Sequence, residues 1–121
     1  MRHYKLLVLA NAKDGEEGEF HRWYDQVHVP EMFAVPELLG IERFELAPAQ
    51  RTPGPHPHRF LAVYDFATDD LQATLQGWAA KSAAMTKPSA VDPDSRVVLV
   101  MQPISPRVTR RDLPAIPGQT S

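Results

Sequence analysis

The residues best suited to chemistry gather in one run of eleven positions, Phe20 to Pro30. This run holds two histidines and an aspartate beside a tryptophan and a tyrosine. Ordinary amphipathic helices seldom carry these polar and aromatic side chains together on their last turns. Polar groups beside aromatic walls are what a small-molecule pocket needs. The run is therefore the first candidate for a binding or catalytic site.

His28 is the candidate base of this run. It follows Tyr24 by four positions and Asp25 by three, so one flank of a helix could hold all three side chains. A neutral imidazole with a nearby carboxylate is a competent general base near pH 7. Asp25 would orient the imidazole by taking the proton of its second ring nitrogen, and Tyr24 would help to polarise a substrate oxygen. The structural alternative is that His28 and Asp25 only cap the helix C-terminus, where the helix dipole favours His.

Aromatic side chains elsewhere are the expected walls of the pocket. The candidates for substrate contact are Trp23, Phe44, Tyr64, Trp78 and Arg43. Core packing is the competing role for Trp23 and Tyr24. For Tyr64, we expect the aromatic ring to form a wall of the pocket, with polar contact by its hydroxyl as the lesser role. Arg43 either pairs with Glu45 or another acid, or points into the pocket to hold an anion. His21 is expected to be a surface partner of Asp25.

The sequence favours neither a metal nor a cofactor. His56 and His58 stand on either side of Pro57, and His3 is a further histidine, but no acid or cysteine lies at ligand spacing from them. Cysteine is absent, which excludes a thiol nucleophile. The chain contains no glycine-rich phosphate loop and no G-x-S-x-G motif. We therefore expect no metal and no cofactor.

Size and charge limit the other classes of function. A chain of 121 residues forms one domain, and a net charge of −2 without a basic stripe gives no reason to expect nucleic acid. No signal peptide is recognised at the N-terminus, and no apolar run is long enough to cross a membrane. We expect a cytoplasmic protein with a domain over residues 1–105 and an extended or disordered proline-rich tail over 106–121.

The expected elements alternate in the order β-α-β-β-α-β. Hydrophobic periodicity predicts strands over residues 4–10, 41–46, 59–66 and 96–101. The first helix runs from about residue 16 to residue 28, with Asp14 as its N-cap and Pro30 ending it. The second helix has Thr68 as its N-cap and ends near Met85. This is the ferredoxin-like α+β plan, a four-stranded antiparallel sheet with both helices on one face.

The same plan predicts a homodimer. The helices cover one face of the sheet, yet the strands over 4–10, 59–66 and 96–101 carry apolar residues on both faces. Monomers avoid exposing so large an apolar surface, and a second copy of the sheet is its simplest cover. We expect two sheets packed face to face around a two-fold axis, with the tail reaching the partner.

A W-Y-D-x-x-H-x-P signature lies in the run from Glu19 to Pro30, and a further stretch from Ala34 to Phe44 continues it. Together they resemble the dimeric α+β barrel superfamily, and more narrowly its EthD-like members. The close match covers about residues 4–46, and the rest agrees in layout. The resemblance implies a pocket between helices and sheet, lined by a histidine at the position of His28. The superfamily includes cofactor-free monooxygenases, lactone isomerases, polyketide cyclases, haem-handling enzymes and proteins of unknown role. Beyond His28, nothing in the chain indicates haem.

Two functions follow as hypotheses. The first is a cofactor-independent enzyme of the isomerase, cyclase or monooxygenase type, which acts on a small, largely apolar, oxygenated ring compound with His28 as general base. The second is a non-catalytic or stress-related dimer that binds a hydrophobic or aromatic metabolite in the same pocket. A packed interior without a cavity would exclude both.

Overall fold

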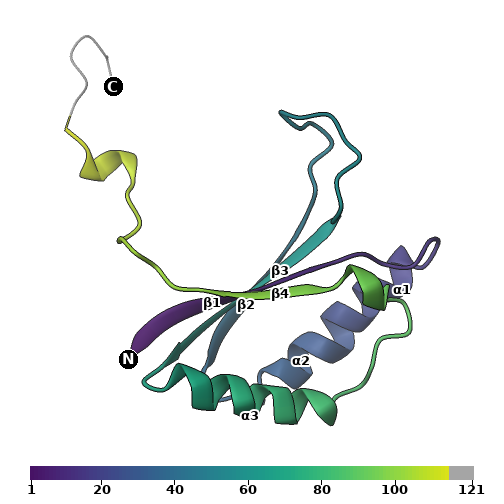
Figure 1. Cartoon of the computed structure of the whole chain (residues 1–121), viewed down its shortest axis with the longest axis horizontal. Coiled ribbons are helices and arrows are strands. Elements are labelled where there is room, and N and C mark those ends of the chain that lie inside the picture. The colour runs from purple at the N-terminus through teal and green to yellow at the C-terminus, as the bar shows by residue number, and fades with distance from the viewer. Residues whose placement is uncertain (115–121) are drawn as a thin grey trace.

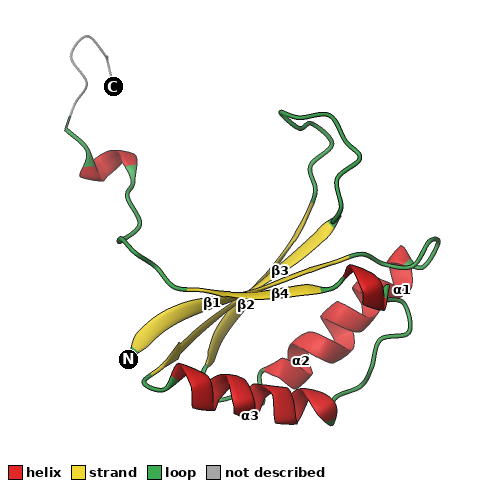
Figure 2. Ribbon diagram, in the orientation of Figure 1, coloured by secondary structure: helices red, strands yellow, loops and turns green. Residues whose placement is uncertain are grey.

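A computed structural model describes residues 1–114 of the chain and shows one antiparallel sheet with its helices on one face (Figure 2). The strands are β1 Arg2–Ala10, β2 Leu38–Glu45, β3 Phe60–Thr68 and β4 Val97–Met101. Their order in the sheet is β2-β3-β1-β4. The predicted ferredoxin-like α+β fold is confirmed, and every predicted strand end lies within three residues of the observed one.

The first helical region is longer than predicted. It consists of α1 Glu17–Trp23, a π-helical segment Tyr24–His28 and α2 Val29–Met32, which follow one another as a single rod (Figure 1). The prediction that Pro30 ends the helix is wrong. Pro30 is the second residue of α2, which follows directly on the π-helical segment, and Phe33 caps the end.

Both predicted helix caps are also wrong. The first helix begins after Glu16, and no side chain caps it; Gly15 forms the preceding turn with a φ of 79°. In α3, Leu71–Ala83, the capping residue is Asp70, whose Oδ1 accepts a hydrogen bond of 3.1 Å from the Ala73 N–H. Thr68 instead supports this cap, since its hydroxyl accepts from the Asp70 N–H at 3.1 Å.

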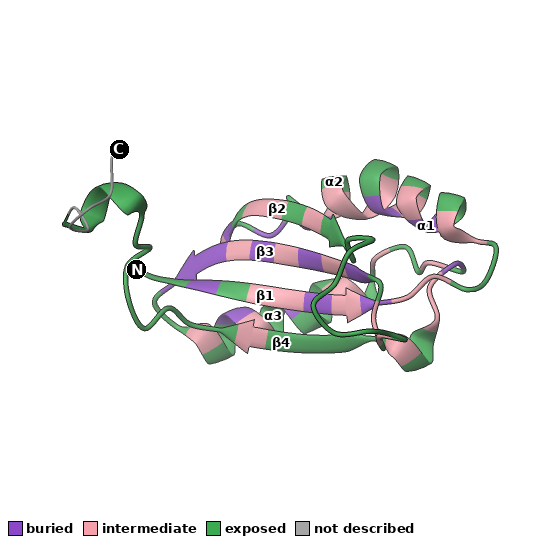
Figure 3. Ribbon diagram, turned by 90° about the horizontal axis from the view of Figure 1, so that it is seen from above, coloured by how far each residue is buried: buried purple, intermediate pink, exposed green. Residues whose placement is uncertain are grey.

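The core lies between the sheet and the helices, and Figure 3 shows the buried positions that alternate along β3. Alternation along β3 directs four side chains toward the helices, and all of them are buried: Phe60, Ala62, Tyr64 and Phe66. Tyr64 occupies the middle of the sheet, because Leu6 of β1 and Ile41 of β2 are its neighbours in register. The helices contribute Phe20, Tyr24, Met32 and Trp78 to the same core. The central strand thus delivers a tyrosine directly under the helical rod.

The other face of the sheet has no helix over it (Figure 1). It carries exposed apolar side chains from an edge strand at each side, among them Leu99 and Met101 of β4 and Phe44 of β2, which are 48%, 53% and 44% exposed. Residues 102–114 extend away from the sheet and include a short 3-10 helix, Arg110–Asp112. The rest of the predicted tail, 115–121, lies outside the described residues. No helix in the described part of the chain is long and apolar enough to cross a membrane.

Candidate functional site

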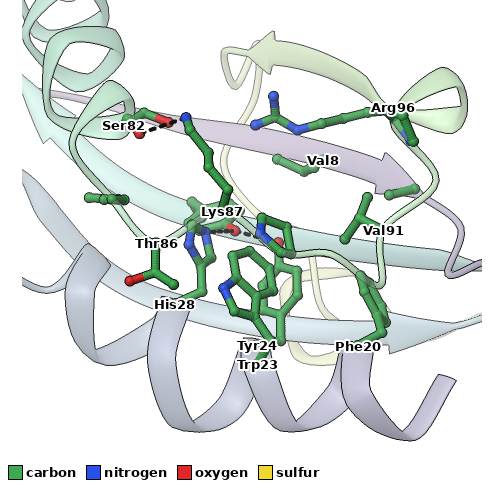
Figure 4. A pocket seen from close by; sticks show the side chains of 15 residues that line it. Val8, Phe20, Trp23, Tyr24, His28, Ser82, Thr86, Lys87, Val91 and Arg96 are labelled. Atoms are coloured by element: carbon green, nitrogen blue, oxygen red, sulfur yellow. Dashed lines mark hydrogen bonds between the residues drawn. The ribbon is translucent and has the colours of Figure 1, made fainter. Parts of the chain in front are cut away.

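A cavity of about 340 Å³ lies between the helical rod, the sheet and the connection from α3 to β4 (Figure 4). Trp23, Tyr24 and His28 line it from the rod, and Tyr64 lines it from β3. A second hollow of about 510 Å³ continues from His28 and Tyr64 along α3 to Trp78. Such a volume is within the range of small-molecule sites. The interior is therefore hollow where the sequence places the candidate residues.

Three polar side chains form a chain of hydrogen bonds on the cavity wall. The Tyr24 and Tyr64 hydroxyl oxygens lie 2.5 Å apart, and the Tyr64 hydroxyl lies 3.1 Å from His28 Nε2. Tyr64 is only 1% exposed and Tyr24 is 5% exposed. Buried hydroxyls require hydrogen-bond partners, and here each tyrosine satisfies the other. The chain of hydrogen bonds ends at the imidazole, which is the one member with a basic nitrogen.

The π-helical segment decides where His28 points. Trp23 and His28 are five positions apart, and their rings stack with centroids 4.5 Å apart and planes inclined by 21°. The wider π turn, in which hydrogen bonds join residues i and i+5, places such positions on one face. Single π turns are frequent at functional sites. The π-helical segment thus stacks the His28 imidazole on the Trp23 ring beside the cavity.

Burial controls the charge state of the three hydrogen-bonded side chains. Loss of hydration lowers the pKa of His28 from 6.5 to about 4; the Glu31 carboxylate opposes this shift and the Arg96 guanidinium adds to it. Burial also raises the pKa of Tyr64 and of Tyr24. At neutral pH the imidazole and both phenols are therefore uncharged.

The expected pair between Asp25 and His28 does not form. The Asp25 carboxylate is turned outward and accepts a hydrogen bond of 3.0 Å from Arg43 Nη1. His28 Nδ1 is buried and has no hydrogen-bond partner among the described residues. The spacing argument assumed a regular α-helix, and the π turn separates the two side chains. The carboxylate that acts on His28 is Glu31, which the sequence analysis missed.

Arg43 and Phe44 lie outside the cavity. The Arg43 guanidinium stands 4.5 Å from the Tyr24 ring centroid, and its Nη2 lies 2.9 Å from His21 Nδ1. His21 therefore contacts Arg43, as Asp25 does, and the expected bond between His21 and Asp25 is wrong. Phe44 belongs to the opposite face of the sheet, since its neighbour in register, Leu61, alternates with the inward Phe60 and Ala62. Of the five candidates for substrate contact, Trp23, Tyr64 and Trp78 line the cavity or the adjoining hollow.

Two cations at the cavity were also missed. Lys87 lies in the connection after α3, and Arg96 stands just before β4; both line the cavity and the adjoining hollow. Neither belongs to a motif. Their placement depends on the path of the connection over residues 84–96, which no periodicity predicts.

The histidines outside the helical rod have structural contacts. His56 Nε2 lies 3.0 Å from the Thr52 carbonyl oxygen, and His58 Nε2 lies 2.9 Å from that of Ser95. Within residues 1–114, no three His, Cys, Asp or Glu side chains cluster closely enough to hold a metal ion.

Comparisons with known proteins identify the fold. No family model matches the chain, and no curated protein matches it. An EthD family protein of Bacillus halodurans is 14% identical with a TM-score of 0.58, over 84% of this chain and 99% of that one. The heme-degrader MhuD of Mycobacterium tuberculosis, solved with two hemes in its active site, is 15% identical with a TM-score of 0.56, over 87% and 99%. A dimeric ferredoxin-like protein of unknown function from Jannaschia sp. CCS1 is 12% identical with a TM-score of 0.50, over 83% and 98%.

These likenesses define the class of protein as ferredoxin-like α+β. The resemblance to EthD-like and other dimeric α+β barrel proteins is confirmed at the level of the fold. At such identities the fold alone is shared, and the activity has to be argued from the site.

Proposed function

We propose that this protein is a cofactor-independent enzyme that moves a proton on a small, oxygenated ring compound bound in the cavity. The observation that supports the proposal most is the buried chain from Tyr24 through Tyr64 to His28 on the cavity wall. The substrate ring would lie against Trp23 and Tyr24, with an oxygen directed to the hydroxyl groups. Aromatic walls bury a ring well, and buried hydroxyls fix its orientation.

The route of the proton follows from the hydrogen bonds. His28 Nε2 is occupied by the Tyr64 hydroxyl. A substrate proton would pass to a tyrosine oxygen while that hydroxyl gives its own proton to Nε2, which leaves a substrate anion and an imidazolium. Because burial raises the pKa of Tyr64, this phenol acts as a relay and does not remain a phenolate.

The weakness of the base selects the reaction. An imidazole with a pKa of about 4 is a weak base, so it can take a proton only where the anion left behind is stabilised, as the oxygen of an enolate or phenolate would be by the tyrosine hydroxyl groups. The buried imidazolium would then return its proton to another atom of the same anion. Isomerisation or cyclisation of a lactone, phenol or polyketide fits this order of proton transfers. Proton transfer of this kind supplies about 10²–10⁴-fold in rate.

Haem does not fit this site. Haem held through His28 would need a free ring nitrogen, but Nε2 is held by Tyr64 and Nδ1 is buried. The proposal therefore takes no step through haem, although one structural neighbour is a heme-degrader.

The proposal includes a homodimer in which the uncovered sheet faces pack together. Its support is the exposed apolar surface of β4 and β2 and the dimeric description of a structural neighbour. The tail from residue 106 onward would reach the partner, since Val108 and Leu113 are each 59% exposed in an arm that leaves the domain over residues 1–105.

A binding protein without catalysis is the second candidate. It is favoured by the unpartnered His28 Nδ1, because a base that no carboxylate orients is poorly prepared for proton transfer. In this case the same cavity would hold a hydrophobic metabolite and leave it unchanged.

Hydrogen exchange of a model ketone separates the two functions. In D2O, 2-tetralone gains deuterium beside its carbonyl, and NMR measures the rate. We expect the wild type to accelerate this exchange, His28→Ala to abolish the acceleration, and Tyr64→Phe to reduce it strongly. His56→Ala is the matched control, because His56 contacts only its own loop through Thr52 among the described hydrogen bonds. Binding of 2-tetralone without accelerated exchange would reject the enzyme and leave the binding protein.

A further inference from the structure

Two basic side chains meet at the same part of the cavity. Lys87 and Arg96 both line the cavity and its adjoining hollow, and both residues are exposed. They come from different segments, and Figure 4 shows their charged ends on the same side of the cavity, away from the Trp23 ring. The cavity thus has an aromatic wall and a cationic edge.

Neither cation of this edge forms an ion pair within the described chain. The ion pairs of the described residues include neither cation; Lys87 Nζ donates to the Ser82 carbonyl oxygen at 3.2 Å. The Glu31 carboxylate has one oxygen engaged by the Thr86 N–H at 3.2 Å. The Asp92 carboxylate accepts from the Asp94 N–H at 3.1 Å. Two like charges at one edge repel each other, and an anion held between them would remove that repulsion.

We propose that Lys87 and Arg96 bind the carboxylate of a ring-bearing acid, whose ring lies in the cavity against Trp23. This inference rests on the proposed function, since it names the substrate class of the same site. The planar guanidinium forms two parallel hydrogen bonds with a carboxylate, and the ammonium adds a point charge. One end of the ligand would thus be held at the edge while its ring reaches Tyr64 and His28.

The test compares two probes of equal shape, 2-naphthoate and the uncharged 2-naphthamide. Calorimetric titration of the full-length protein should show 2-naphthoate binding at least tenfold more tightly, with an affinity that falls as salt is added. Arg96→Gln and Lys87→Gln should each weaken 2-naphthoate binding about tenfold and leave 2-naphthamide within twofold. Arg51→Gln, an exposed cation on the loop between β2 and β3, is the control and should change neither probe.

Each outcome separates this inference from the proposed function. Equal binding of the two probes, or loss of both in Arg96→Gln while the variant remains folded, would overturn the carboxylate site and leave the cavity and its proton chain standing. If neither probe binds the wild type, the carboxylate site is rejected, and the exchange of 2-tetralone alone decides the proposed function. Tight 2-naphthoate binding that survives Arg96→Gln together with Lys87→Gln would place the anion elsewhere and would also reject the inference.

Discussion

The free energy of unfolding should depend on pH through His28. Burial lowers the pKa of His28 from 6.5 to about 4, so the unfolded chain binds a proton that the native chain rejects between these values. Stability is therefore complete above the unfolded pKa, falls as the pH drops through this range, and levels off below about 4. Linkage gives a loss of about 2 kcal/mol at about pH 5 relative to about pH 7.5. Because His28 is only partly buried, solvent screening reduces the expected loss to about 1–2 kcal/mol.

Urea unfolding at the two pH values measures this loss. The wild type carries other titrating groups, so the informative quantity is the difference between the wild type and His28→Gln at equal protein concentration. The variant should lose about 1–2 kcal/mol less than the wild type between the two pH values. His56→Gln, on the exposed loop, should follow the wild type. If His28→Gln shows the same pH dependence as the wild type, the imidazole is not desolvated and the reasoning about its charge state is refuted.

Three further predictions concern the chain of hydrogen bonds, Asp25 and the sheet face. Tyr64→Phe should lower the free energy of unfolding by about 1–3 kcal/mol, because it removes the shared partner of Tyr24 and His28. Tyr24→Phe should lower it by less, and equal losses of the two variants in thermal or urea unfolding would contradict this order. Asp25→Asn should leave tetralone exchange within about twofold of the wild type, since its only described partner is Arg43, and a collapse of the rate like that of His28→Ala would restore the pairing with His28. Leu99→Lys on β4 should convert a dimer into monomers in light scattering, whereas a wild type with the mass of one chain would reject the dimer itself.

The fold was predictable because its elements carry clear periods. Alternation along β3 separates Phe60, Ala62 and Tyr64 from Leu61 and Val63, and the structure shows this division. The same rule could have excluded one expected wall. Phe44 and Arg43 are adjacent on a strand, so they face opposite sides and cannot line one cavity. The sequence thus showed that one of the two is misplaced, and the register with β3 shows that Phe44 faces away from the helices.

The site was predictable in part. The run that ends in His28 and Pro30 does lie at the cavity, but the π turn is not visible in a pattern of apolar residues. A regular α-helix would have placed Asp25 nearer to the imidazole. The chain therefore stacks His28 on Trp23 and leaves Asp25 to Arg43.

The cationic edge could not be predicted from the sequence. Lys87 lies soon after α3 and Arg96 just before β4, and nothing in their local sequence links them. Only the three-dimensional return of the chain over the cavity brings them together.

A crystal structure grown with 2-tetralone tests the central claim most directly. The account predicts the ketone between helix and sheet, with its ring against Trp23 and its carbonyl oxygen within hydrogen-bond reach of the Tyr24 or Tyr64 hydroxyl. Side chains that fill this space, with His28 turned to solvent and its bond to Tyr64 absent, would contradict it.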